Sequence, residues 1–123
     1  MTSDGEDNAS TRTRDEIVHV IAHTHWDREW YLPAGRFRQR LASLIDELLD
    51  STGDSGPFLL DGQAVVLDDY ADVRPDRVAD LHTALRSGRI EAGPWYVLAD
   101  ELIPSGEALV RNLFAGRRTL RRA

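Results

Sequence analysis

The chain has 123 residues, of which 41% are hydrophobic and 29% are charged, a balance typical of one small soluble domain. Its formal net charge of −6 excludes a strongly basic surface, so we expect no nucleic-acid partner. The absence of cysteine excludes disulfide bonds and thiolate metal ligands. No apolar run approaches the roughly 20 residues of a membrane-spanning helix, so we expect no membrane partner either.

The first 14 residues differ in character from the rest of the chain. Residues 1–14 are polar and acidic, and they contain no apolar core of the kind found in a signal peptide. We therefore expect a disordered acidic tail over residues 1–14, and a folded part over residues 15–123. A cytoplasmic location is the default expectation for such a sequence.

A strand followed by a chemically rich loop is predicted next. Residues 17–22 form an apolar run rich in β-branched side chains, which predicts a buried strand. Residues 23–30 then read His-Thr-His-Trp-Asp-Arg-Glu-Trp. Extended residues two apart point the same way, so His23, His25 and Asp27 could present a row of imidazole and carboxylate ligands suited to zinc. The alternative is a solvated loop that happens to contain two histidines.

Two amphipathic helices are predicted from apolar side chains that recur at spacings of three and four. The first covers residues 37–48 and ends near Asp50, before the turn-forming run of residues 51–57. The second begins at Pro75, where the missing N–H costs little, and ends at Gly88.

A short second strand is predicted between these helices. Residues 58–60 form a continuous apolar run, followed by Asp61 and Gln63 and then by a short helix up to Tyr70. The two polar residues have two interpretations. They are either functional groups at the carboxyl end of the strand, or a turn followed by a helix cap.

A third strand and a last helix complete the predicted elements. Residues 89–98 predict a strand that is interrupted at Gly93–Pro94 and leads to Asp100. Ser105 is a suitable N-cap for the last helix, in which residues 109–114 supply an apolar stripe.

The order of these elements predicts an α/β fold with a parallel sheet, because helical connections bring successive strands into the same direction. The carboxyl ends of parallel strands share one edge, so we expect His23, His25 and Asp27 to gather there with Asp61, Gln63, Asp100 and Glu101. One imidazole and two carboxylates could hold zinc with an open position for substrate. A carboxylate beside the metal stays ionised and could attack an electrophilic carbon.

Four segments carry a resemblance to a known family. Residues 23–30, 58–63, 93–101 and 105–113 resemble, in the same order, motifs of the family 38 glycoside hydrolases, the retaining α-mannosidases, with the bacterial-type branch as the best match. The resemblance covers about residues 15–123. It implies a partial parallel β/α barrel, which is the N-terminal portion of the catalytic domain.

The resemblance also implies roles for individual residues. His25, Asp27 and Asp100 would be zinc ligands, and Asp100 would also be the nucleophile that forms a glycosyl-enzyme intermediate. Trp30 would lie under the mannose ring, and His23 would support the site without binding the metal. The implied substrate is an α-mannoside or a mannose-containing oligosaccharide.

Two groups that the family uses are missing from this stretch. The family's fourth zinc ligand, a histidine, and its general acid lie far downstream. Glu101 is a poor substitute for the acid, because it adjoins Asp100 and retaining chemistry needs carboxyl groups roughly 5–5.5 Å apart. We therefore expect an N-terminal segment that is inactive alone and that has the remaining C-terminal portion of the enzyme as a partner. The alternatives are a piece of a metal-dependent carbohydrate deacetylase, and a non-catalytic remnant or interaction module.

Overall fold

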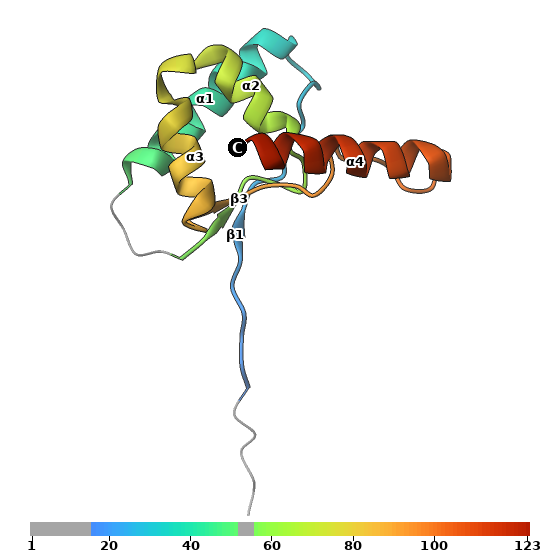
Figure 1. The fold of residues 1–123 in the computed structure, drawn as a ribbon, viewed down its shortest axis with the longest axis horizontal. Coiled ribbons are helices and arrows are strands. Elements are labelled where there is room, and N and C mark those ends of the chain that lie inside the picture. The colour runs from blue at the N-terminus through green and yellow to red at the C-terminus, as the bar shows by residue number, and fades with distance from the viewer. Residues whose placement is uncertain (1–15, 52–55) are drawn as a thin grey trace, which may run out of the picture.

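The computed structural model describes residues 16–51 and 56–123, which form the predicted α/β fold (Figure 1). The tail expected over residues 1–14 and the centre of the turn-forming run lie outside the described residues. No helix in the described ranges is long and apolar enough to cross a bilayer. The elements follow in the order β1 (Ala22–His23), α1 (Ala34–Asp50), β2 (Phe58–Leu59), α2 (Val65–Val73), the 3-10 helix η1 (Pro75–Arg77), α3 (Val78–Arg86), β3 (Ile90–Glu91) and α4 (Gly106–Arg122).

The sheet has three short parallel strands in the order β1-β2-β3, as the element order predicts. Ala22 lies opposite Phe58, and Phe58 lies opposite Ile90. The β1–β2 hydrogen bonding continues one step further, because the Thr24 backbone N–H donates to the Leu59 carbonyl at 3.1 Å. The carboxyl ends of all three strands therefore share one edge.

The prediction of a buried strand over residues 17–22 is wrong in extent and in burial. Only Ala22 and His23 pair with β2, and the preceding residues run away from the sheet (Figure 1). Ile17, Val18, Val20 and Ile21 are between 69% and 88% exposed. The physical reason is that β2 is too short to pair with them and no described element covers either face of this segment.

The third strand is also shorter than the predicted span of residues 89–98. β3 contains only Ile90 and Glu91. Gly93 has a φ of +80°, which is incompatible with extended strand geometry, and Pro94 has no N–H to donate to a ladder. Strand-like pairing resumes as a single parallel bridge between Gln63 and Trp95.

Helices α1, α2 and α3 gather on one side and enclose the core (Figure 1). The apolar periodicity predicted for α1 is confirmed, since Phe37, Leu41 and Ile45 are buried. The Tyr70 hydroxyl on α2 donates to Asp46 Oδ1 on α1 at 2.7 Å. Burial and this bond both raise the pKa of Tyr70. The core contains Leu41, Ala42, Ile45, Leu49, Leu60, Val66, Leu67, Tyr70, Leu81, Ala84 and Ile90.

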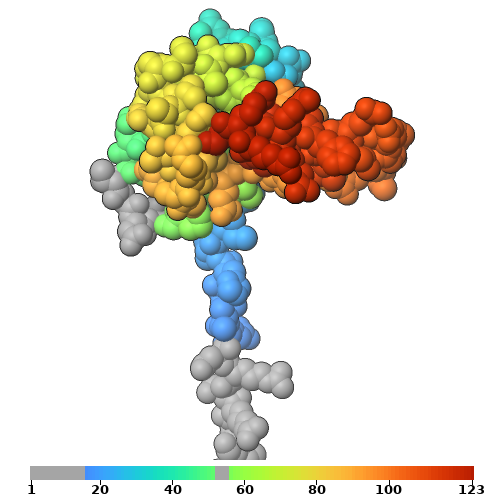
Figure 2. Space-filling model, in the orientation of Figure 1, coloured from blue at the N-terminus to red at the C-terminus, as the bar shows by residue number. Residues whose placement is uncertain are grey.

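Helix α4 begins as predicted but buries different residues. The Ser105 hydroxyl accepts from the Ala108 backbone N–H at 3.2 Å, which confirms the N-cap. The first part of the helix projects from the body (Figure 2), and Phe114 in the predicted apolar stripe is 66% exposed. The buried residues of α4 are Gly116 and Thr119, where the helix crosses the chain that follows β3.

Candidate active site

The loop after β1 places its two strongest metal-ligand candidates side by side on an outward face. His25 Nε2 and Asp27 Oδ1 lie 3.7 Å apart, and their side chains are 70% and 40% exposed. His23 is also exposed, and its Nδ1 hydrogen-bonds to the Thr24 carbonyl at 2.9 Å. Trp30, at the end of the loop, is 74% exposed. Of the predicted row of ligand candidates, His25 and Asp27 therefore lie side by side and exposed.

The residues that alternate with His25 and Asp27 contact the body of the protein. Thr24 continues the pairing with β2. The Trp26 backbone N–H donates to Asp61 Oδ2 at 2.8 Å, and its ring meets Phe37 edge-on at a centroid distance of 6.1 Å. The Arg28 side chain reaches back to α2. Anchored and outward residues thus alternate along the loop.

Asp61 is the first of two buried carboxylates that hold this loop. It is 6% exposed and accepts from the Trp26 N–H, from the Gly62 N–H at 2.7 Å and from Gln63 Nε2 at 2.9 Å. Gln63 Nε2 also donates to the Trp26 carbonyl at 2.6 Å. Asp61 has a φ of +91°, a conformation that costs energy in a residue other than glycine and that the three bonds stabilise.

The two interpretations of Asp61 and Gln63 can now be compared. The helix-cap interpretation is wrong, because α2 begins after Ala64 and no side chain caps its first turn. Both residues are instead buried at the carboxyl end of β2, where they bind the loop after β1.

Asp69 on α2 is the second buried carboxylate, at 2% exposure. Arg28 donates to it twice, from Nε at 2.7 Å and from Nη2 at 2.9 Å. These hydrogen bonds with Asp69 raise the pKa of Arg28. Arg38 Nε, from α1, lies 2.9 Å from Asp69 Oδ1 and adds a second positive charge without hydrogen-bond geometry.

Sequence reasoning missed Asp69. One signal could have found Asp69. It lies four residues after Val65 and three after Val66, so it falls on the buried face of a helix. A carboxylate in that position requires a cationic partner.

Asp100 lies on an exposed loop between Trp95 and α4. Its Oδ1 accepts from the Leu102 N–H at 3.2 Å, and its carbonyl accepts from the Ile103 N–H at 3.0 Å. Over residues 16–51 and 56–123, no three His, Asp or Glu side chains form a group that could hold a metal ion. The predicted convergence of His25, Asp27 and Asp100 therefore extends only to the first two.

Asn112 on α4 fixes the segment that leads to Asp100. Its Oδ1 accepts from the Tyr96 and Val97 N–H groups, both at 3.0 Å, and its Nδ2 donates to the Val97 carbonyl at 2.7 Å. The side chain thus substitutes for a missing strand partner.

We expect Asn112→Ala to lower the free energy of unfolding by roughly 2 kcal/mol, because the Val97 N–H and carbonyl lose their partner and the Tyr96 N–H keeps only a 3.3 Å bond to the backbone carbonyl of residue 112. Urea denaturation followed by circular dichroism would measure the loss. Ser43→Ala is a suitable control, since Ser43 makes one exposed bond to the Gln39 carbonyl. Equal stability of the two variants would contradict this role for Asn112.

The His25–Asp27 pair fits two positions of a zinc site. Two nitrogen or oxygen ligands of a tetrahedral zinc ion lie roughly 3.4 Å apart, given metal–ligand distances of about 2.0–2.2 Å. The observed separation of 3.7 Å is close to this value. An imidazole and a carboxylate are also the ligand types of catalytic zinc sites.

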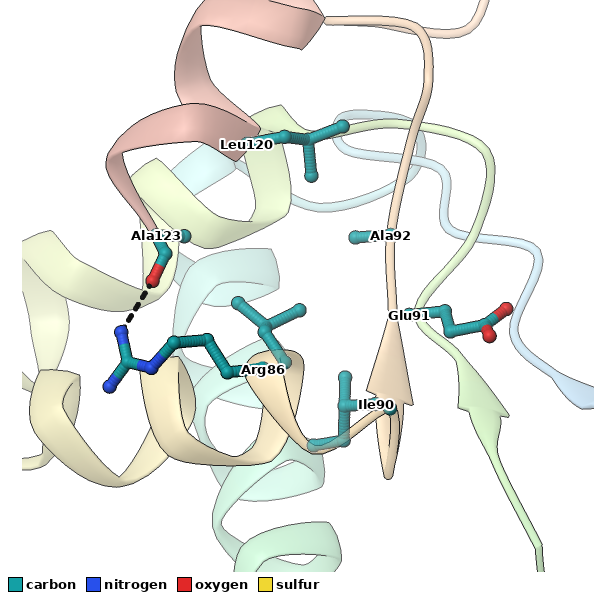
Figure 3. A pocket seen from close by; sticks show the side chains of 8 residues that line it. Arg86, Ile90, Glu91, Ala92, Leu120 and Ala123 are labelled. Carbon is teal, nitrogen blue, oxygen red and sulfur yellow. Dashed lines mark hydrogen bonds between the residues drawn. The ribbon is translucent and has the colours of Figure 1, made fainter.

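Several cavities of the described region are lined by no residue of this loop. One of about 400 Å³ is lined by residues of α3, β3 and the end of α4 (Figure 3). Arg86 there donates to the Ala123 carbonyl at 3.0 Å, and Glu91 points away from Arg86. We assign no part of the candidate active site to this cavity.

Comparison with known proteins identifies the family. The model of the N-terminal domain of glycosyl hydrolases family 38 matches residues 16–123. The chain belongs to glycosyl hydrolase family 38. This confirms the resemblance found in the four sequence motifs, and with it the α/β class of the fold.

Individual relatives agree with the family 38 assignment. A protein of Halalkalibacterium halodurans named "Putative mannosylglycerate hydrolase" is 43% identical over 104 residues, 82% of this chain and 12% of the relative. The crystal structure of an α-mannosidase from Enterococcus faecalis V583 matches with a TM-score of 0.78 and 39% identity over 83% of this chain and 12% of that chain. A family 38 protein from Enterococcus faecalis gives a TM-score of 0.72 and 35% identity with the same coverage. The chain therefore spans about 12% of the length of these relatives.

Proposed function

We propose that this chain forms the N-terminal part of the active site of a zinc-dependent, retaining α-mannosidase. The observation that carries the proposal is the outward-facing pair of His25 and Asp27, 3.7 Å apart on an anchored loop of a family 38 chain. Family membership also favours a glycosidase over the carbohydrate deacetylase that the residues alone would allow.

In this proposal His25 Nε2 and Asp27 Oδ1 are two of the zinc ligands, and Asp100 is the third. Bound zinc supplies positive charge that polarises and orients the hydroxyl groups of the sugar. The described structure does not bring Asp100 to the other two side chains, so the proposal requires its exposed loop to rearrange when the rest of the active site assembles.

The chain's residues have separate tasks in hydrolysis. The Asp100 carboxylate attacks the anomeric carbon of the mannoside as the bond to the leaving group breaks, and water later hydrolyses the resulting glycosyl ester. Trp30 is exposed and offers an apolar face to the sugar ring. His23, beside the ligands, supports the site.

The general acid that protonates the leaving group has no candidate among these residues. Glu101 adjoins Asp100 in the chain, so the two carboxyl groups are unsuited to opposite sides of one glycosidic bond. We therefore propose that the chain acts only with further family 38 polypeptide. Two of the three relatives are named as a mannosylglycerate hydrolase and an α-mannosidase, and we propose a mannose glycoside as the substrate class here as well.

A chimeric enzyme tests this proposal. Residues 16–123 would replace the matching segment of the Enterococcus faecalis α-mannosidase, and the product would be assayed with an aryl α-mannoside and with mannosylglycerate. We expect hydrolysis of at least one substrate and one zinc ion per chain by mass spectrometry. We expect His25→Ala and Asp27→Ala to lose zinc and to lower kcat/KM by more than about a hundredfold, since changes outside the ligand shell alone reach that size.

His82→Ala is the matched control, because His82 is a partly buried histidine on α3, away from the loop. It should retain both zinc and activity. A chimera that hydrolyses its substrate equally well after His25→Ala and Asp27→Ala would overturn the proposed site. A folded chimera with no activity would favour the non-catalytic remnant.

A further inference from the structure

We propose that Asp69 is a positioning residue, which holds the loop of residues 24–30 so that His25 and Asp27 already face a shared divalent cation before it binds. The inference rests on the function proposed above, and it concerns a residue that touches neither the cation nor the substrate. It follows from the way in which two buried carboxylates fix the residues on either side of Asp27.

Asp27 has an anchored neighbour on each side. On one side, the backbone N–H and carbonyl of Trp26 bind Asp61 and Gln63 at 2.8 Å and 2.6 Å. On the other side, the guanidinium of Arg28 makes two bonds to Asp69, at 2.7 Å and 2.9 Å. Asp27 therefore has little backbone freedom, although its own side chain is 40% exposed and makes no hydrogen bond within the described residues.

The contact between Arg28 and Asp69 restrains the loop through both its charge and its geometry. Two parallel N–H···O bonds between a guanidinium and a carboxylate fix orientation as well as distance. Asp69 is almost completely buried, and Arg38 approaches from α1, so the loop is tied to two helices at one point. A buried carboxylate without a cationic partner costs free energy. Conformations of the loop in which Arg28 leaves Asp69 are therefore unfavourable.

Such an anchor raises metal affinity by reducing the ordering that binding requires. A loop that samples many conformations must lose that freedom when two of its side chains bind one ion. In the present loop His25 Nε2 and Asp27 Oδ1 already lie 3.7 Å apart. Residues that orient metal ligands commonly contribute about 10–100-fold to metal affinity.

The test measures binding of Co²⁺ alone to the complete 123-residue chain, from visible absorption and from the paramagnetic shifts of the His25 ring protons. We expect Asp69→Asn to weaken binding roughly tenfold. The matched control is Asp46→Asn, which breaks a comparable network of Asp46 with Tyr70, Arg74 and Arg77 far along α1. The control should lose stability but keep its Co²⁺ affinity within about twofold, since Asp46 makes no contact with the loop.

A second variant covers the case in which Asp69→Asn does not fold. Arg28→Lys keeps the positive charge but cannot make two parallel bonds, and we expect about threefold weaker binding. Unchanged affinity in folded Asp69→Asn or in Arg28→Lys would overturn the positioning role. Equally weakened Co²⁺ binding in Asp46→Asn would also overturn the positioning role, because the loss of affinity would then follow from lower stability of the whole chain. Failure of the unaltered chain to bind Co²⁺ at His25 would also overturn the inference, because a pair of side chains that already faces the cation should bind it in this chain. The proposed metal site itself would be overturned only if the chimeric enzyme bound no zinc.

Discussion

Asp61→Ala is expected to lower the free energy of unfolding by roughly 4 kcal/mol, because three hydrogen-bond donors lose one buried acceptor and each such loss costs about 1–3 kcal/mol before relaxation. The donors are the N–H groups of Trp26 and Gly62 and the amide of Gln63. Alanine would also have to keep a φ of +91°, which is unfavourable for any side chain with a Cβ. Urea denaturation followed by Trp fluorescence would measure the loss.

Two further substitutions at Asp61 separate the hydrogen bonds from the backbone strain. Asp61→Asn keeps one acceptor oxygen and a residue type that tolerates positive φ, so we expect a loss of roughly 1–2 kcal/mol. Asp61→Gly removes the strain but also the acceptor, and its stability should fall between those of the other two. If Asp61→Gly were as stable as Asp61→Asn, the hydrogen bonds to the acceptor would contribute no more than the backbone strain that glycine relieves.

Gly116→Ala should produce the second large effect. A Cβ at Gly116 would lie 2.2 Å from the Pro94 carbonyl oxygen, 2.5 Å from the Trp95 carbonyl carbon and 2.7 Å from the Tyr96 nitrogen. All three are backbone atoms, so no side-chain rotation can relieve the overlap. We expect a net loss of about 2–3 kcal/mol, despite the roughly 1 kcal/mol by which alanine favours a helix over glycine.

Gly106→Ala, in the first turn of the same helix, is the control for this effect. A Cβ there meets nothing within 4 Å, so the variant should be as stable as the unaltered chain or slightly more stable. Thermal unfolding by circular dichroism would compare the two. Similar melting temperatures for both variants would show that α4 does not pack as closely against residues 94–96 as the structure describes.

The sequence predicted those features that depend on local patterns. The spacing of Phe37, Leu41 and Ile45 determined the buried face of α1, and Ser105 determined the start of α4. The alternation of helices and strands predicted the parallel sheet, because few other arrangements connect such elements. The four motifs predicted the family correctly.

Features that depend on distant partners could not be predicted in the same way. The burial of residues 17–21 was expected from their apolar character, yet burial also requires a neighbouring surface, and none lies beside them in the described chain. The contact between Arg28 and Asp69 joins residues 41 apart, and no local pattern pairs these two among the many charges of the chain. Asp100 was placed at a strand end, but the chain turns at Gly93 before it reaches that residue.

The alternation along residues 24–28 has a consequence for how this stretch can vary. Thr24, Trp26 and Arg28 hydrogen-bond to the body of the protein, whereas the side chains of His25 and Asp27 are exposed. Deleting or inserting a single amino acid between them would exchange the two sets, since neighbouring positions of an extended chain face opposite ways. The tryptophan would then be turned toward water and a histidine toward the hydrophobic interior. Substitutions can be accommodated one at a time in such a segment, but a change in its length cannot.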